Sequence, residues 1–153
     1  MNQIKSLLEG ISELYHRLIL IVGPIGSGKT MTLAELAAAE NVPVLNVSFA
    51  ISRKLLDLTE RQRVLQLPRI LEEVASGFPA NPILLDNTEL LFDPVLRQDP
   101  LRLLQGLSRD KTIVATWLGN VNGGFLTYAA PEHPEFRRYS AVDLLVVCVG
   151  QEN

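Results

Sequence analysis

A glycine-rich octapeptide near the N-terminus has the residue types and spacing of a phosphate-binding loop. It matches the Walker A pattern GxxxxGK[ST] in full, through Gly23, Pro24, Ile25, Gly26, Ser27, Gly28, Lys29 and Thr30. Glycines let the backbone turn tightly, so that its N–H groups face a phosphate. The lysine would then reach the β- and γ-phosphates of a nucleoside triphosphate, and the threonine hydroxyl would bind Mg²⁺. The motif predicts binding of ATP, or another nucleoside triphosphate, with Mg²⁺.

The segments on both sides of this loop have the patterns that a phosphate-binding loop requires. Residues 18–22 form an apolar, β-prone run directly before it, and residues 31–40 form a helix-prone stretch directly after it. The N-terminus of that helix adds positive potential at the loop. We therefore expect the nucleotide to be contacted by residues 23–30 and by Met31, the next residue along the chain.

A second motif is a hydrophobic run that ends in a carboxylate. Residues 83–85 lead into Asp86, which is the Walker B pattern. A carboxylate at this position can orient the metal ion against the hydroxyl of Thr30. We therefore expect Thr30 and Asp86 to be the protein groups at the metal.

Two further groups are candidates for contacts with the terminal phosphate. Thr116 and Asn120 lie where the fourth predicted strand ends and a loop at 119–124 begins, and either is a candidate polar sensor or an ordinary strand-end or turn residue. Arg137 and Arg138 lie shortly before the last predicted strand. Arg138 is a candidate arginine finger that would act on a neighbouring subunit, which predicts a nucleotide-dependent homo-oligomer, and a solvated arginine pair is the alternative.

Length and composition indicate one compact domain over residues 1–153. The chain has 153 residues, of which 47% are hydrophobic and 20% charged, with a net charge of −3. That charge does not favour a surface that coats nucleic acid or an anionic membrane. A local cluster of basic residues between positions 53 and 63 is interpreted as an exposed helix face, with a DNA-binding patch as the alternative.

The chain shows no targeting signal and no membrane span. Acidic residues occur close to its N-terminus, no continuous apolar segment follows them, and the longest apolar runs have the length of strands. We therefore expect a cytoplasmic protein without membrane contact. Cys148 lies in an apolar run and is interpreted as a buried structural thiol.

Apolar runs alternate with helical patterns along the whole chain. This alternation indicates an α/β fold, a three-layer P-loop NTPase in which helices cover both faces of a five-stranded parallel sheet. Ligands of such sheets bind at the carboxyl ends of the strands, where the glycine-rich loop also lies. The five expected strands are residues 18–22, 43–49, 82–86, 112–117 and 144–149.

The helical patterns include two regions with open questions. An amphipathic helix is expected within residues 1–15, either packed on the core or acting as a lid or subunit contact. Residues 52–76 are predicted to be helical, with a new start at Thr59, a kink or break at Pro68 and an end at Gly77.

The order of these motifs resembles the core of AAA+ and related ATPases. GTPases and nucleotide kinases fit less well, because the chain has no NKxD-like base-reading motif and no obvious arginine-rich lid. Over nearly its full length the chain looks like the BrxF family, the small P-loop NTPases of type 3 BREX bacteriophage-defence systems. That resemblance rests on residues 23–30, 46–48, 55–59, 61–63 and 85–87.

The resemblance implies a set of partners as well as a fold. It implies action with other proteins of a defence system that methylates host DNA and blocks phage replication, although the chain has no methyltransferase or nuclease motif. AAA+ proteins also carry a helical C-terminal lid with a second sensor arginine. The chain ends at Asn153 directly after its last predicted strand, so we expect an AAA+-like core without that lid.

The residue after the Walker B aspartate is the second departure from the AAA+ pattern. Many AAA+ ATPases have a glutamate there that polarises the attacking water, and this chain has Asn87. An amide can orient a water but cannot take its proton. Glu89 is the nearest acid; it would point elsewhere if the backbone stays extended, and it is also interpreted as a surface carboxylate.

We therefore expect a minimal AAA+-like ATPase that hydrolyses ATP slowly, or only when it oligomerises or meets a partner. A non-hydrolysing nucleotide switch that docks partner proteins is the main alternative, and a small-molecule kinase is a third. The residues expected at the reacting phosphate are Lys29, Asp86, Asn87, Thr116 and Arg138.

Overall fold

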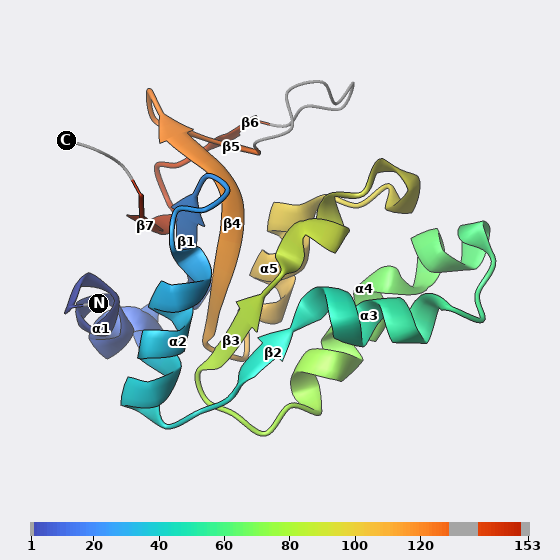
Figure 1. The fold of residues 1–153 in the computed structure, drawn as a ribbon, viewed down its shortest axis with the longest axis horizontal. Coiled ribbons are helices and arrows are strands. Elements are labelled where there is room, and N and C mark those ends of the chain that lie inside the picture. The colour runs from blue at the N-terminus through green and yellow to red at the C-terminus, as the bar shows by residue number, and fades with distance from the viewer. Residues whose placement is uncertain (1, 129–137, 151–153) are drawn as a thin grey trace.

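The protein is an α/β structure with an open, mostly parallel sheet (Figure 1). The computed structural model describes residues 2–128 and 138–150. Within these residues, five strands run parallel in the order β2-β3-β4-β1-β7, and β5 and β6 extend β4 by antiparallel pairing. The α/β prediction is confirmed, and the sheet has two more strands than we expected. The strands are β1 (Leu18–Gly23), β2 (Val44–Asn46), β3 (Ile83–Asp86), β4 (Ile113–Asn122), β5 (Phe125–Tyr128), β6 (Arg138–Ser140) and β7 (Leu145–Cys148).

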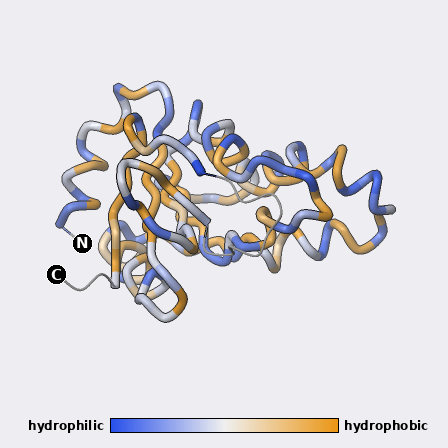
Figure 2. The backbone as a smooth tube through the Cα atoms, turned by 90° about the horizontal axis from the view of Figure 1, so that it is seen from above, coloured by the Kyte–Doolittle hydropathy of each residue, from blue (hydrophilic) through white to orange (hydrophobic). Residues whose placement is uncertain are grey.

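Helices lie on both faces of the sheet and bury two hydrophobic clusters. Every residue of β1 is buried, and because side chains alternate along a strand, Leu20 faces the cluster with α3, α4 and α5 while Ile21 faces the cluster with α1 and α2. Figure 2 shows hydrophobic stretches of the chain in the middle of the fold and hydrophilic stretches mainly around them. The helices are α1 (Asn2–Gly10), η1 (Ile11–Glu13), α2 (Lys29–Glu40), α3 (Val47–Leu55), α4 (Glu60–Ser76), η2 (Thr88–Phe92), η3 (Pro94–Leu96) and α5 (Pro100–Leu107), of which the η elements are 3₁₀ helices.

The N-terminal helix packs on the core. The predicted helix within residues 1–15 is α1 followed by the 3₁₀ turn η1. Ile4 and Ile11 are buried in the same cluster as Leu33 and Leu36 of α2. This contact bears out the core interpretation of the amphipathic stripe.

The second strand is shorter than predicted, because an asparagine starts a helix inside the expected strand. β2 ends at Asn46, and residues 47–49 belong to α3. The Asn46 side-chain oxygen accepts a hydrogen bond from the Phe49 N–H at 3.0 Å, which satisfies one of the free donors at the helix start. The prediction of a strand through Phe49 is wrong for this reason.

Helix α4 continues through its proline. The helix starts at Thr59 as predicted, through a capping box with Gln62, and it ends at Gly77, but the residues on both sides of Pro68 remain helical. Proline has no N–H, so the Val64 carbonyl one turn earlier loses its partner in the helix. The side-chain amide of Gln98 donates to that carbonyl at 2.9 Å. A contact from a distant segment therefore replaces the missing bond, and the predicted break does not occur.

The predicted loop at 119–124 is a β-hairpin. β4 continues to Asn122, the chain turns at Gly123 and Gly124, which both have positive φ angles, and β5 returns beside β4. Position 119, within the strand, requires a glycine, because a Cβ there would overlap the Thr127 carbonyl oxygen. The glycines that favoured a loop thus serve a turn and a close strand approach.

The ends of the described chain bear on two further expectations. Cys148 is exposed, so its interpretation as a buried thiol is wrong; β7 is the outermost strand of the parallel path and has a neighbour on one side. No helix in residues 2–128 and 138–150 is long and apolar enough to cross a membrane.

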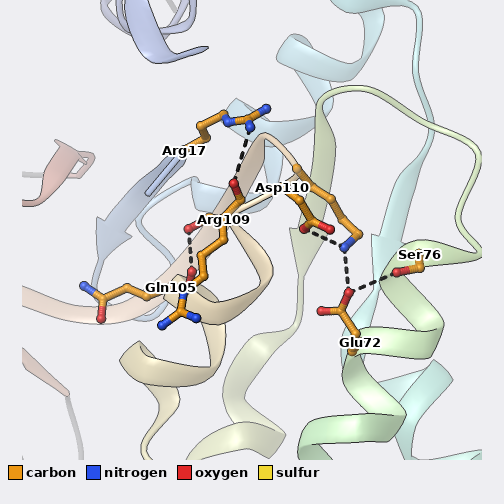
Figure 3. A network of polar contacts seen from close by, with 8 residues as sticks. Arg17, Glu72, Ser76, Gln105, Arg109 and Asp110 are labelled. Carbon is orange, nitrogen blue, oxygen red and sulfur yellow. Dashed lines mark hydrogen bonds and ion pairs between the residues drawn. The ribbon is translucent and has the colours of Figure 1, made fainter. Parts of the chain in front are cut away.

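A polar network ties α4 to the amino ends of the strands (Figure 3). The Lys111 ammonium donates to Glu72 at 2.7 Å and to Asp110 at 2.9 Å, and the Arg17 guanidinium donates to the Arg109 carbonyl at 3.3 Å. Burial alone would lower the pKa of Lys111, but the bonds to the two carboxylates raise it above the ordinary value. This network anchors the end of the sheet opposite the glycine-rich loop.

The bond from Gln98 to the Val64 carbonyl can be tested by a double-mutant cycle. We expect Gln98→Ala to lower the free energy of unfolding by about 1 kcal/mol, because it leaves this carbonyl without its donor. In a Pro68→Ala background the backbone N–H at position 68 can bond to that carbonyl, so the same change should cost less. Urea denaturation of the four proteins measures both costs. Equal costs in the two backgrounds would contradict the coupling.

Candidate functional site

The glycine-rich loop connects β1 to α2 at the carboxyl edge of the sheet (Figure 1). Gly26 has φ +75° and Gly28 has φ +94°, in the left-handed region that glycine adopts without strain. The Ser27 N–H donates to the Pro24 carbonyl at 3.2 Å, which closes a tight turn inside the loop. The backbone thus turns where the Walker A glycines predict that it should.

An open hollow lies against this loop. It has a volume of about 550 Å³ and is lined by residues 26–31 and Ala34. Among the described residues no side chain caps the start of α2 at Gly28, so the first N–H groups of the helix are free to bind an anion. Six of the nine predicted nucleotide-contacting residues, 26–31, therefore line one hollow.

Lys29 folds back over the loop and lies near two carboxylates. Its ammonium donates to the Pro24 carbonyl at 2.8 Å. Burial lowers the pKa of Lys29, and the negative charges of Glu89 and Asp86 partly oppose that effect. The Walker A lysine and the Walker B aspartate thus meet at the same edge of the sheet.

Asp86 ends β3 and is held by two hydrogen bonds. Asp86 is 8% exposed, and its Oδ1 accepts from the Thr116 hydroxyl at 3.0 Å and from the Asn87 N–H at 2.9 Å. β4 lies between β3 and β1, and Thr116 on β4 is opposite Ile21 on β1. One strand therefore separates the Walker B strand from the strand of the glycine-rich loop.

The two candidate sensors occupy different environments. Thr116 lies beside the β1 strand, but it is 1% exposed and its hydroxyl is directed to Asp86. Asn120 is exposed further along β4, in the part paired with β5. Thr116 therefore orients the predicted metal-binding carboxylate, and a phosphate contact by either residue stays a prediction.

Asn87 reverses the direction of the chain directly after Asp86. It has φ +53°, and its carbonyl accepts from the Ser48 N–H at 3.1 Å and from the Ser48 hydroxyl at 2.5 Å. The next residue, Thr88, is buried and donates its hydroxyl to the Thr116 carbonyl at 2.6 Å. The backbone beyond Asp86 is therefore not extended, and the condition under which Glu89 would point elsewhere is not met.

Glu89 is a further carboxylate whose charge reaches this site, although the sequence favoured a surface carboxylate at this position. It lies in η2, is half-buried, and its charge acts on Lys29. The signal in the sequence was Asn87 itself, because asparagine adopts the left-handed conformation more readily than most residues.

The arginine candidates come from segments that are distant from the glycine-rich loop in the sequence. Arg138 is exposed on β6, and its guanidinium lies over the Phe125 ring at 4.2 Å from the ring centre. Arg137 is outside the described residues. In the basic cluster, Arg53 and Lys54 are exposed on α3, and Arg53 lies over the Phe49 ring at 5.5 Å. An exposed helix face agrees with these positions, and DNA binding there stays a prediction.

Comparisons with known proteins give no information about this site. Neither protein-family models nor curated proteins give a match to this chain. Within the part of the chain that the structure describes, no three His, Cys, Asp or Glu side chains gather as a metal cluster. A metal ion held by Thr30 and Asp86 stays a prediction.

The bond from Thr116 to Asp86 predicts a specific loss of stability. Thr116→Val keeps the shape of the side chain but removes the donor, so we expect the free energy of unfolding to fall by about 2 kcal/mol. Thr116→Ser should keep most of it. Thr127→Val is the matched control, because the Thr127 hydroxyl makes an exposed contact with the Asn120 carbonyl at 3.4 Å. Equal losses for the two valine variants in urea denaturation would show that the bond contributes nothing specific.

Proposed function

We propose that this protein is a minimal AAA+-like P-loop NTPase that binds ATP with Mg²⁺ and hydrolyses it slowly. The observation that carries the proposal is that the hollow at residues 26–31 has Lys29 within the electrostatic reach of Asp86. A free helix N-terminus, a lysine and a carboxylate are the protein groups that bind a nucleoside triphosphate with its metal.

The residues of the hollow fit this ligand. ATP carries its negative charges on the phosphates, and the loop offers N–H groups of α2 and the Lys29 ammonium, which would exchange the Pro24 carbonyl for a phosphate oxygen. Thr30 is exposed in the first turn of α2. Both bonds to Asp86 go to Oδ1, so Oδ2 remains available for a metal-bound water.

The surface around the hollow supports closure by a second copy of the chain. Ile25, within the loop, is 85% exposed, and Met31, directly after it, is 69% exposed. Apolar side chains that flank an open site favour a protein contact. We propose a nucleotide-dependent homo-oligomer in which Arg138 of one copy acts on ATP bound to the next.

The wider role rests on the resemblance to the BrxF family. It supports a cytoplasmic component of a BREX-type bacteriophage-defence system that acts with other proteins of that system. A non-hydrolysing nucleotide switch is the second candidate, and the exposed amide of Asn87 next to Asp86 favours it.

Nucleotide binding is tested by removing the lysine. We expect Lys29→Ala to weaken ATP·Mg²⁺ binding by about tenfold or more, because it removes a charge-assisted bond to the phosphates. A fluorescent ATP analogue measures affinity, and phosphate release measures turnover. Lys54→Ala, on the exposed face of α3, is the control and should behave as the wild type. Equal affinity for the Lys29 variant and the wild type would contradict the proposal.

The arginine in trans is tested by particle mass and by concentration dependence. We expect the particle to be larger with ATP than without it, and phosphate release per chain to rise with protein concentration. Arg138→Ala should reduce release to the level of Lys29→Ala, since such arginines contribute about 10³-fold or more, while ATP affinity is nearly kept. Arg69→Ala on α4 is the control. A monomer whose specific activity is independent of concentration would overturn the oligomer.

A further inference from the structure

The short helix η2 fixes the direction of Glu89. In a 3₁₀ helix, side chains three positions apart lie on the same face, so Glu89 and Phe92 project from the same side of η2. Phe92 stacks on Tyr128 of β5, with ring centres 4.0 Å apart and an angle of 12° between the planes. Phe92 also meets Trp117 edge to face at 4.7 Å. These contacts hold the face of η2 that carries Glu89 toward the β4–β5 hairpin.

The electrostatic environment of two other groups agrees with this placement. Burial raises the pKa of Tyr128, and the charge of Glu89 raises it further. The same charge opposes the lowering of the Lys29 pKa by burial, and it does so more strongly than the charge of Asp86. The charge of Glu89 therefore acts both on Tyr128 of β5 and on the lysine of the glycine-rich loop.

Asp86 and Asn87, the other polar residues at this edge of the sheet, are not suited to accept the proton. Asp86 is bonded through Oδ1 to Thr116 and to the Asn87 N–H, and it is the expected metal group. Asn87 has an amide, which cannot take a proton. Among the described residues that act on Lys29, the carboxylates are Glu89 and Asp86. Glu89 is thus the remaining carboxylate that can accept a proton at this site.

We propose that Glu89 is the general base for ATP hydrolysis, a role that rests on the function proposed above. Its carboxylate takes a proton from a water molecule as the water oxygen forms a bond to the γ-phosphorus. The bond from the γ-phosphorus to the β–γ bridging oxygen breaks, and its electron pair stays on ADP. Inorganic phosphate leaves, and Glu89 returns its proton to solvent.

Asn87 is a positioning residue in this arrangement. Its left-handed conformation ends β3 and turns the chain into η2, so the direction of Glu89 is set by that short helix and not by an extended strand. A glutamate directly after the Walker B aspartate is therefore not required, because the turn brings a later carboxylate to the site.

The base is tested with Glu89→Gln in the full-length protein. We expect phosphate release to fall by about 100-fold or more, to the background of Lys29→Ala, because general base catalysis contributes about 10²–10⁴-fold. Affinity for the fluorescent ATP analogue should be at least that of the wild type, since the change removes a negative charge near the phosphates. Glu40→Gln, at the far end of α2 from the loop, is the matched control and should keep wild-type release.

The positioning role is tested with two variants of Asn87. Asn87→Gly allows the same positive φ, so it should keep phosphate release within about threefold of the wild type. Asn87→Val disfavours that conformation, so it should lower kcat as Glu89→Gln does, with little change in KM. The fluorescence of Trp117, which is buried against Phe92, verifies that each variant is folded. Loss of turnover in Asn87→Gly would assign the catalytic role to the amide and overturn the proposal.

The remaining outcomes separate this inference from the proposed function. Wild-type release by Glu89→Gln overturns the base and leaves the ATPase intact. Failure of Glu89→Gln to bind the analogue assigns Glu89 to binding and likewise overturns the base. A wild-type protein that binds ATP but releases no phosphate above Lys29→Ala, at any protein concentration, overturns both the ATPase and its base and favours the nucleotide switch.

Discussion

The site is organised around the contact between Thr116 on β4 and Asp86 on β3. Asp86 is 8% exposed, and burying a carboxylate is costly unless donors satisfy it; here its Oδ1 accepts from the Thr116 hydroxyl and from the Asn87 N–H. Thr116 is also opposite Ile21 on β1, the strand that enters the glycine-rich loop. The position of the Walker B carboxylate relative to the loop is therefore set by the backbone pairing of three neighbouring strands.

The same residue also fixes how the chain leaves the sheet. The Thr116 carbonyl accepts from the Thr88 hydroxyl at 2.6 Å, so the side chain and the main chain of one residue hold both ends of the turn around Asn87. The Asn87 carbonyl is bonded to Ser48 at the start of α3. Hydrogen bonds with β4 and with α3 thus hold the turn at Asn87 in its left-handed conformation. These bonds determine where the next acid, Glu89, can lie.

Local patterns predicted the elements, and contacts between distant segments account for the errors. The glycine-rich loop and Asp86 meet at one sheet edge, as the alternation of strands and helices predicted. The apolar run after Pro43 was misjudged because the Asn46 cap competes with the strand. The helix continues past Pro68 because Gln98, thirty residues later, supplies the missing donor. The turn at Asn87 escaped prediction because strand periodicity carries no information on a single φ angle.

The charges at this edge decide what the site can bind. Lys29 is near two carboxylates, Asp86 and Glu89, so the edge is not strongly positive before a ligand arrives. A triphosphate adds further negative charge, which the lysine and the N–H groups of α2 cannot balance alone. A divalent cation placed between Asp86 and the phosphates would offset that excess. Glu89, held in η2 by the stacking of Phe92 on Tyr128, would then stay separate from the metal and free to accept a proton. The turn at Asn87 thus separates the two carboxylates, which would have different roles in the proposed ATPase.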